Sequence, residues 1–517
     1  MSITITDVPG VHTPGATKNM VSLLPIEMLV YILEELEVDL QALLRCRLVC
    51  KLFQQLIDNN ANLQYKIALR EAYQKDGPPG PDSSASRLEK LRAHQTAWSS
   101  FSWSSVQDFE TPLTDRFQLE GNVIAELTSE GTGVKFIQLP SVLRGIPMRE
   151  WTVDVGVLAR DFFIDPDQNL LVLLEAPLWD SESFLHRLHL RTMTDGQQHP
   201  LAAASPLLRR SHKHEHHEIF YISEIYGSSL AILVSDFDEP EYEQHDLNIY
   251  NWKTGNLMKF ISTSNLPMFS FLDEQNIIIV ALDFHTHSFY LFVYDCTGKD
   301  AEEFHLEKNF RCRLEFPIIY PDFDVEEISI QSHPSPRYPP QYGDIRPPFS
   351  GDRLHNIFNI ELKLSCNSLL RRFNLFVPTS TFHKAIGSAA PYAEARVPWV
   401  DWGTGCYLVN IGRDFEDVHG MKLVDLHSDT GKVEIWDFNP YAAHRTRQVL
   451  DSLENRIPDS PRRPDAYIDI FRDPILTCAP FRVFKHTFTE SFIILEVLIS
   501  EDSVVLIHDD GFRILTF

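Results

Sequence analysis

Residues 21–57 read VSLLPIEMLVYILEELEVDLQALLRCRLVCKLFQQLI and open the first strongly patterned part of the chain. Apolar residues recur there every three or four positions, which predicts three short amphipathic helices. The predicted apolar faces comprise Leu29, Ile32, Leu33 and Leu36 in the first helix, Leu40, Leu43 and Leu44 in the second, and Val49, Phe53, Leu56 and Ile57 in the third. About forty residues cannot bury all these side chains and their apolar neighbours among themselves. We therefore expect a second polypeptide to cover the surplus.

The order of residues within this stretch resembles an F-box. The resemblance rests on the run Leu24–Leu29 and on the run Leu43–Phe53, which reads LLRCRLVCKLF. It implies a three-helix module that docks on the Skp-type adaptor of a cullin–RING ubiquitin ligase. Carried over position by position, the adaptor-facing residues would be Leu24, Pro25, Ile26, Leu29, Ile32, Leu43, Leu44, Val49, Cys50 and Phe53. Phe53 departs from the many F-boxes that have tryptophan there, which keeps the aromatic ring but drops an N–H donor.

Two later stretches extend the resemblance to the large F-box families of mushroom-forming fungi. They are Ser86–Trp98, which reads SRLEKLRAHQTAW, and Phe163–Glu175, which reads FIDPDQNLLVLLE. In those families the region after the F-box is rich in β-structure. The competing interpretation of residues 21–57 is the core of an ordinary helical subdomain packed on the rest of the chain.

Composition and charge limit the class of protein. A chain of 517 residues is longer than the roughly 250–300 residues that one hydrophobic core organises, and its 44% hydrophobic and 23% charged residues are typical of a folded soluble protein. The net charge of −26, from 72 acidic residues against 46 Lys and Arg, argues against binding to nucleic acid or to an anionic membrane. No apolar run approaches the roughly 20 residues of a membrane helix, and the start of the chain does not look like a signal peptide. Seven scattered cysteines indicate reduced thiols, so we expect an intracellular protein of the cytoplasm or nucleus.

Changes in composition and in hydrophobic periodicity divide the chain into four parts. We expect a disordered tail over residues 1–20, the helical F-box domain over 21–73, a linker with a connecting helix over 74–120, and a client-binding β domain over 121–517. The linker Gly77–Ser84 is rich in Pro and Gly, which break helices. Trp98, Phe101 and Trp103 lie where the helical and β regions meet, and we expect their packing to fix the relative orientation of the two regions.

Short β-branched and aromatic runs separated by turn residues fill the region from about Gly121 onward. A strand, a Thr-Gly turn and a second strand recur around Thr254-Gly255, Thr297-Gly298 and Thr430-Gly431, and the first two copies lie about 43 residues apart. A period of about 40–45 residues with several strands per unit is typical of a β-propeller. We expect a propeller-like domain of six to eight blades, with an array of two-sheet sandwiches as the competing architecture.

Residues that could carry chemistry are few. Four histidines within residues 212–217 could chelate a metal, but no second ligand cluster completes a site, and a solvated loop is the simpler interpretation. Cys46 and Cys50 would share a helix face without a neighbouring base to activate them. Neither a Gly-x-Ser-x-Gly nucleophile elbow nor a phosphate-binding loop is present. We therefore predict no catalytic residue, no metal and no cofactor.

The predicted function is that of a non-catalytic adaptor. The F-box would bind the Skp-type subunit and, through it, the cullin and RING subunits, while the β domain would bind a client protein whose identity the sequence does not reveal. Two alternatives remain open: an F-box scaffold that supports no ubiquitination, and a propeller enzyme decorated by helices.

Overall fold

A computed structural model describes most of the chain. The described residues are 24–38, 40–175, 185–203, 206–210, 219–236, 245–263, 268–283, 288–297, 303–304, 308–333, 346–366, 369–388, 394–410, 417–443, 470–472, 475, 477, 479–489 and 492–517. The His-rich loop at 212–217 and the tail at 1–20 lie outside them.

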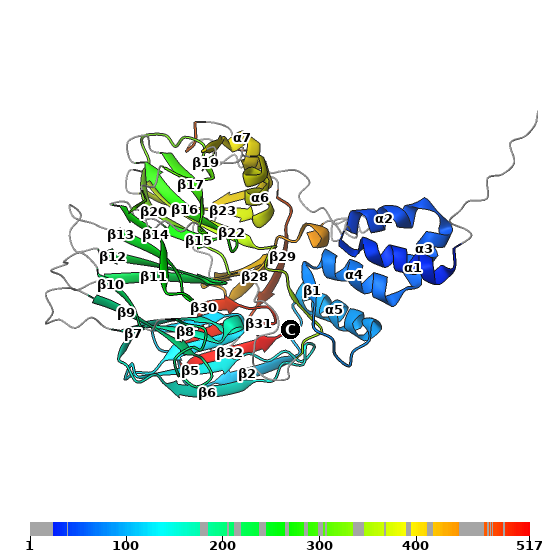
Figure 1. Ribbon diagram of the computed structural model, residues 1–517, viewed down its shortest axis with the longest axis horizontal. Coiled ribbons are helices and arrows are strands. Elements are labelled where there is room, and N and C mark those ends of the chain that lie inside the picture. Colours follow the sequence, from blue (N-terminus) through cyan, green and yellow to red (C-terminus); the bar gives the residue numbers. More distant parts are fainter. Residues whose placement is uncertain are drawn as a thin grey trace, which may run out of the picture.

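The N-terminal part is helical, as the apolar periodicity predicts. Its helices are α1 (Ile26–Glu34), the 3₁₀ turn η2 (Glu35–Val38), α2 (Leu40–Val49), α3 (Lys51–Asn59), α4 (Ala61–Glu71) and α5 (Ser84–Ser99). Side-chain caps start the last two helices: Asn60 accepts from two backbone N–H groups of α4, and Ser83 accepts from one of α5. Figure 1 shows α1–α3 at the outer end of the molecule and α5 close to the β domain.

The boundary between α2 and α3 differs from the expected one. Cys50 has an extended backbone, with φ −158° and ψ 162°, and precedes the first residue of α3. Val49 therefore ends α2 and does not belong to the stripe of the third helix. Cys46 and Cys50 likewise do not share one helix face, because the extended residue separates their helices.

The β-rich region is a propeller of seven blades, a number within the predicted six to eight, and the sandwich array is wrong. Seven antiparallel sheets follow one another along the chain, five of them with four strands and two with an extra parallel strand at one edge. Each blade takes consecutive or nearly consecutive strands, because hairpins connect neighbouring strands within a sheet. The predicted turns at Thr254-Gly255 and Thr430-Gly431 join such hairpins, and Gly298 of the remaining predicted turn lies outside the described residues.

The strands of the first four blades are as follows. Blade 1 contains β3 (Phe117–Glu120), β4 (Val123–Leu127), β5 (Gly133–Gln138) and β6 (Arg149–Asp154); blade 2 contains β7 (Ala159–Asp165), β8 (Leu170–Glu175), β9 (Leu185–Thr192) and β10 (Leu207–Arg210); blade 3 contains β11 (Ile219–Tyr226), β12 (Ser229–Asp236), β13 (His245–Asn251), β14 (Asn256–Thr263) and β18 (Glu303–Phe304); blade 4 contains β15 (Met268–Phe271), β16 (Asn276–Asp283), β17 (Ser288–Asp295), β19 (Cys312–Glu315) and β24 (Ala395–Val397).

The remaining three blades complete the ring. Blade 5 contains β20 (Asp324–Gln331), β22 (Ile357–Cys366), β23 (Leu369–Pro378) and β25 (Tyr407–Asn410); blade 6 contains β26 (Asp417–His419), β27 (Lys422–His427), β28 (Lys432–Asp437) and β29 (Arg482–Thr487); blade 7 contains β30 (Ile494–Ile499), β31 (Ser503–His508), β32 (Gly511–Thr516) and β2 (Ser105–Phe109). The helices α6 (Thr379–Ser388) and α7 (Trp399–Trp402) and the 3₁₀ turns η3 (Pro166–Gln168) and η4 (Gly403–Gly405) lie between strands.

Blade 7 closes the ring with a strand from far upstream. Strand β2 follows the helical region directly and pairs antiparallel with β32, from Ser105 opposite Thr516 to Phe109 opposite Phe512. The propeller strands therefore begin before the expected boundary at residue 121. Gly511 makes this closure possible: its φ is +157°, and a Cβ there would collide with the carbonyl oxygen of Phe109.

Part of the expected linker also belongs to the folded structure. Strand β1 (Gln74–Asp76) pairs antiparallel with β21 (Phe349–Gly351), which attaches the helical region to the propeller by backbone hydrogen bonds. Apolar clusters fill the spaces between neighbouring blades, for example Val172 and Leu190 of blade 2 against Leu230 and Ile232 of blade 3. None of the described helices is long and apolar enough to cross a membrane.

Candidate partner-binding site

The outer helices form a small hydrophobic core of their own. Leu33 of α1, Leu43 of α2 and Ile57 of α3 pack with Leu63 and Ile67 of α4. Outside this core Arg47 of α2 pairs with Asp58 of α3, with Nε 2.6 Å from Oδ1. This core contains five buried side chains, which is a small number for four helices. Much of the apolar surface of these helices is therefore uncovered.

The uncovered side chains constitute what we call the apolar ledge. They lie at the start and along the exposed face of α1 and around the α2–α3 junction: Leu24, Ile26, Met28, Tyr31, Ile32, Leu48, Val49 and Leu52. Leu48 and Val49 are the most open, with 81% and 69% of their surface exposed. Single exposed apolar residues are ordinary on protein surfaces, but eight large ones within thirty residues indicate an interaction surface.

Six of the ten residues predicted to face an adaptor are exposed, namely Leu24, Pro25, Ile26, Ile32, Val49 and Cys50. Leu44 and Phe53 are half-buried. Leu29 and Leu43 are buried, with 3% and 1% of their surface exposed, and Leu43 packs in the helical core. These two side chains support the fold of the helices and leave almost no surface for a partner.

Sequence reasoning left four ledge residues out of the predicted contact set. Met28, Leu48 and Leu52 were recognisable as apolar residues outside the helical stripes, and they are exposed. Tyr31 carried no such signal, because a tyrosine on an amphipathic helix suits either the core or the surface. The extended backbone at Cys50 explains why Leu48 and Val49 project so far: they end one helix just before the chain turns into the next.

The inner helices, in contrast, are packed on the propeller. The hydroxyl of Tyr65 in α4 lies 2.7 Å from the carbonyl oxygen of Pro348 and 3.0 Å from Asp76 Oδ1. Arg87 of α5, which is buried, places Nη1 2.5 Å from Asp76 Oδ1 and donates from Nη2 to the carbonyl oxygen of Pro78. Leu88 and Leu91 join Tyr65 in an apolar cluster with Phe349 of the propeller-side strand β21.

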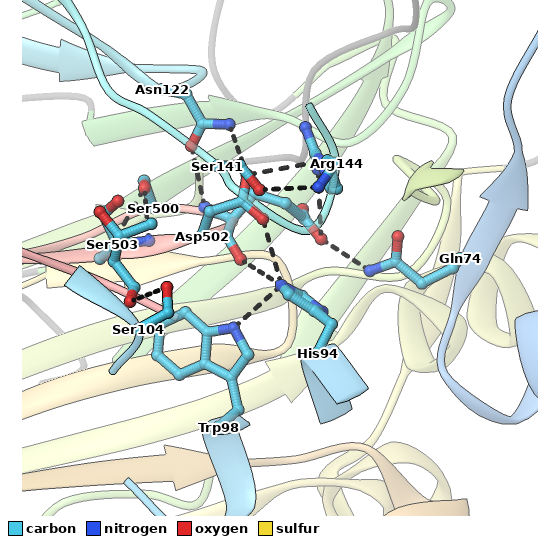
Figure 2. Close-up of polar contacts among 12 residues, drawn as sticks. Gln74, His94, Trp98, Ser104, Asn122, Ser141, Arg144, Ser500, Asp502 and Ser503 are labelled. Carbon is cyan, nitrogen blue, oxygen red and sulfur yellow. Dashed lines mark hydrogen bonds and ion pairs between the residues drawn. The ribbon is translucent and has the colours of Figure 1, made fainter. Parts of the chain in front are cut away.

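A buried ionic network continues this attachment at blade 7 (Figure 2). Arg144 places Nε 3.4 Å from Asp502 Oδ2 and Nη1 4.0 Å from Glu501 Oε1. His94 of α5 lies 3.2 Å from Asp502 Oδ1 through Nε2. Removing one member of such a buried group leaves another charge uncompensated, which costs about 3–5 kcal/mol. The network therefore specifies how α5 sits against the ring.

Glu501 is the point at which several segments meet. Gln74 of β1 donates to its Oε1 at 2.6 Å, and His419 of blade 6 lies 3.4 Å from its Oε2. Burial by itself would raise the pKa of this carboxyl group. The hydrogen bond from His419 and the charge of Arg144 outweigh burial and hold the pKa of Glu501 well below its usual range. Glu501 is therefore ionised at neutral pH and attracts the donors around it, Gln74, His419 and Arg144.

Aromatic packing completes the junction between helices and propeller, as the positions of Trp98, Phe101 and Trp103 in the sequence predict. The Trp98 ring stacks on Phe517, with centroids 4.2 Å apart and an interplanar angle of 11°. Phe101 meets the same Phe517 edge-on at 5.6 Å, and Trp103 packs at the rim of this cluster. The end of α5 and the residues that follow it are thus held by aromatic contacts with Phe517, which follows β32.

The described residues also contain one candidate metal site. Among the described residues one group of three side chains has metal-ligand spacing, Asp425, His427 and Glu434 of blade 6. Two ammonium groups already hold Glu434 Oε1 there, from Lys432 at 2.5 Å and Lys485 at 3.1 Å, so this group is better described as an ion-pair ladder.

Comparison with known proteins agrees with this geometry. An F-box-like family model matches residues 21–70, which span α1–α4. The protein thus consists of an F-box-like domain followed by a seven-bladed β-propeller, an architecture that fits a non-enzymatic adaptor. No curated protein matches the chain, and the more specific likeness to the F-box families of mushroom-forming fungi stays a prediction.

Proposed function

We propose that this protein is the client-recruiting subunit of a Skp–cullin–F-box ubiquitin ligase. The apolar ledge binds the Skp-type adaptor, which connects the chain to the cullin and RING subunits. The propeller binds the client. The observation that carries the proposal is that the F-box-like helices leave eight large apolar side chains exposed while a second set of helices is locked onto the propeller.

The ledge is large enough to anchor a complex. A large apolar side chain that passes from full exposure to full burial contributes about 1.5–3 kcal/mol. The ledge side chains are between 37% and 81% exposed, so covering all eight would supply roughly 6–13 kcal/mol. Association costs about 4–15 kcal/mol in lost freedom of motion. The two ranges overlap, so a stable complex requires that most of the ledge is covered.

The rigid attachment of α4 and α5 to the propeller would fix where a bound client lies relative to the ledge. Transfer of ubiquitin requires the client to sit at a set distance from the enzyme that carries ubiquitin. The ionic network and the Trp98 stack hold the propeller in one orientation relative to the ledge, so a bound client keeps a fixed position.

The decisive experiment changes the ledge in the full-length protein. The double variant Leu24→Asp with Pro25→Ala should lose more than a hundredfold in affinity for a purified Skp-type adaptor, because a carboxylate would be buried unpaired at the interface. The matched control is Leu201→Asp, which introduces the same charge at an exposed leucine of the propeller and should leave adaptor affinity unchanged. Adaptor binding that survives the double variant would show that the contact surface is assigned wrongly.

The ligase part of the proposal has its own test. A client labelled by proximity to the propeller should accumulate when the double variant replaces the wild-type protein, and proteasome inhibition should abolish the difference. A client whose abundance does not respond would favour the scaffold.

A further inference from the structure

The first strands of the seven blades surround a central channel of about 400 Å³. Residues of β3, β7, β11, β15, β20, β26 and β30 line it, so every blade contributes its innermost strand. A volume of this size is in the range of cavities that hold small ligands or single side chains.

Carboxyl groups outnumber cationic side chains in the lining of the channel. Two cationic side chains, His333 and Arg353, face six carboxyl groups: Glu120, Asp165, Asp167, Glu224, Asp417 and Glu496. Both cations already have carboxylate partners. His333 Nδ1 lies 2.9 Å from Glu120 Oε1, and Arg353 Nη1 lies 3.4 Å from Asp167 Oδ2.

Some of the other carboxyl groups receive only backbone or hydroxyl donors. Glu224 of blade 3 accepts from the backbone N–H of Phe271 in blade 4, and Asp417 of blade 6 accepts from the backbone N–H of Ile499 in blade 7. These bonds join neighbouring blades and do not neutralise the charge. Among the described residues, no hydrogen bond or ion pair reaches the carboxyl group of Glu496. A β-bulge between Ile494 and Glu496 interrupts the regular alternation of side chains at this point of β30.

Three of these carboxyl groups have raised pKa values, because burial outweighs the opposing charge of His333 at Glu224 and Asp417. Burial raises the pKa of Glu224 to about 8 and also raises the pKa of Asp417. Burial, followed by the charge of Asp417, raises the pKa of Glu496. The ionised forms of all three are disfavoured as the channel stands, so an arriving positive charge would stabilise them.

A hydroxyl group supplies an independent indication of a ligand. Ser332 follows β20, is 7% exposed and lines the channel. Its Oγ has no hydrogen-bond partner among the described residues. Buried polar atoms are normally satisfied, so this unpaired hydroxyl, which can donate or accept, indicates that a hydrogen-bond partner is missing from the channel.

The spacing of the carboxyl groups favours an organic cation over a metal ion. Within the described part of the chain, the group with metal-ligand spacing is the ion-pair ladder of blade 6, which contains none of the channel residues. A metal ion needs several oxygen ligands within about 2–2.6 Å of itself. An ammonium or guanidinium group carries several N–H donors and reaches more widely spaced oxygens.

We propose that the central channel binds a positively charged side chain of the client, the ammonium group of a lysine or the guanidinium group of an arginine, between Glu496, Asp417 and Ser332. This inference rests on the proposed function, since it names the chemistry of the client. The carboxylates supply the charge, and the serine hydroxyl accepts one N–H bond. The long-range attraction of a chain with net charge −26 would bring basic segments to the ring.

The test measures peptide binding to the full-length protein without adaptor. The probe is a fluorescent nine-residue peptide of alternating glycine and arginine, and its neutral counterpart has citrulline in place of arginine. We expect the arginine peptide to bind at least tenfold more tightly than the citrulline peptide. Glu496→Gln should weaken arginine-peptide binding about tenfold or more, and Ser332→Ala should weaken it severalfold.

The control for general charge attraction is Glu130→Gln, which removes one exposed carboxylate outside the channel. It should leave peptide affinity unchanged. Thermal melting of each variant verifies folding. Equal binding of the two peptides would overturn the proposal, as would equal effects of Glu496→Gln and Glu130→Gln, or displacement of the peptide by stoichiometric Mg²⁺ or Ca²⁺. Because the adaptor is absent, failure here leaves the ledge assignment standing, and loss of the ledge assignment leaves this measurement valid.

Discussion

The outer helices α1–α3 and the inner helices α4–α5 follow the same local helix-forming rules, but their apolar side chains lie in different environments. Ile26 and Ile32 of α1 remain open to solvent, whereas Leu91 and Trp98 of α5 are buried against the propeller. The difference depends on whether another part of the same chain lies close enough to pack on the apolar face. The inner helices pack on the propeller of their own chain, whereas the outer helices leave an exposed apolar face that we propose another chain covers. Amphipathicity alone therefore predicts a binding face without saying whether the partner is internal.

The largest effect should come from the inner helices. Trp98→Ala should lower the free energy of unfolding by about 3–5 kcal/mol, because it empties the stack on Phe517. Urea denaturation measures the loss, and solution scattering should show a looser arrangement of helices and propeller. Trp103→Ala, at the partly buried rim of the same cluster, should cost less. An unchanged stability and scattering profile for Trp98→Ala would show that this junction does not hold the regions together.

A smaller effect is expected where the inner helices meet the propeller through a single hydroxyl. Tyr65→Phe should cost about 1–2 kcal/mol, because the carbonyl oxygen of Pro348 and Asp76 lose a donor while the ring stays packed. Tyr31→Phe changes the same atom on the exposed face of α1 and should leave stability unchanged. Equal costs for the two variants, measured by the same denaturation experiment, would contradict the contrast between inner and outer helices.

The smallest effect on stability should come from the ledge itself. Leu48→Ser should change the free energy of unfolding by no more than about 0.5 kcal/mol, because this side chain is already in water. The same variant should weaken adaptor binding roughly tenfold or more. Leu33→Ala in the outer core is the counterpart and should cost about 2–5 kcal/mol. A large loss of stability in Leu48→Ser would mean that the ledge is part of the fold.

The features that could be predicted are those encoded over short distances. The amphipathic period placed the outer helices, and Leu29 and Leu33 are buried on the predicted face. The Thr-Gly turns at a spacing of about 43 residues indicated blades, because each blade is built from local hairpins. The position of Trp98, where the helical and β regions of the sequence meet, indicated the aromatic junction.

The features that could not be predicted depend on residues far apart in the chain. Strand β2 has no local sign of its partner, because it pairs with β32 about 400 residues later. The ionic network likewise joins His94 and Arg144 to Asp502. In the outer helices, the contact set carried over from the resemblance included Leu43, which faces the core, and omitted Leu48, which faces solvent. The extended residue Cys50, which ends α2 just after Leu48 and Val49, has no distinctive signature in the sequence.

The pairing of β2 with β32 has a consequence for how the molecule is made. Side-chain partners across this seam lie far apart in the chain, for example Asp108 and Arg513, which are 405 positions apart. At about 5–20 residues per second, a ribosome needs roughly 20–80 s to synthesise the intervening chain. During that interval the nascent strand has a bare edge that invites mispairing. The ring can therefore close only after the strands of the last blade have been synthesised.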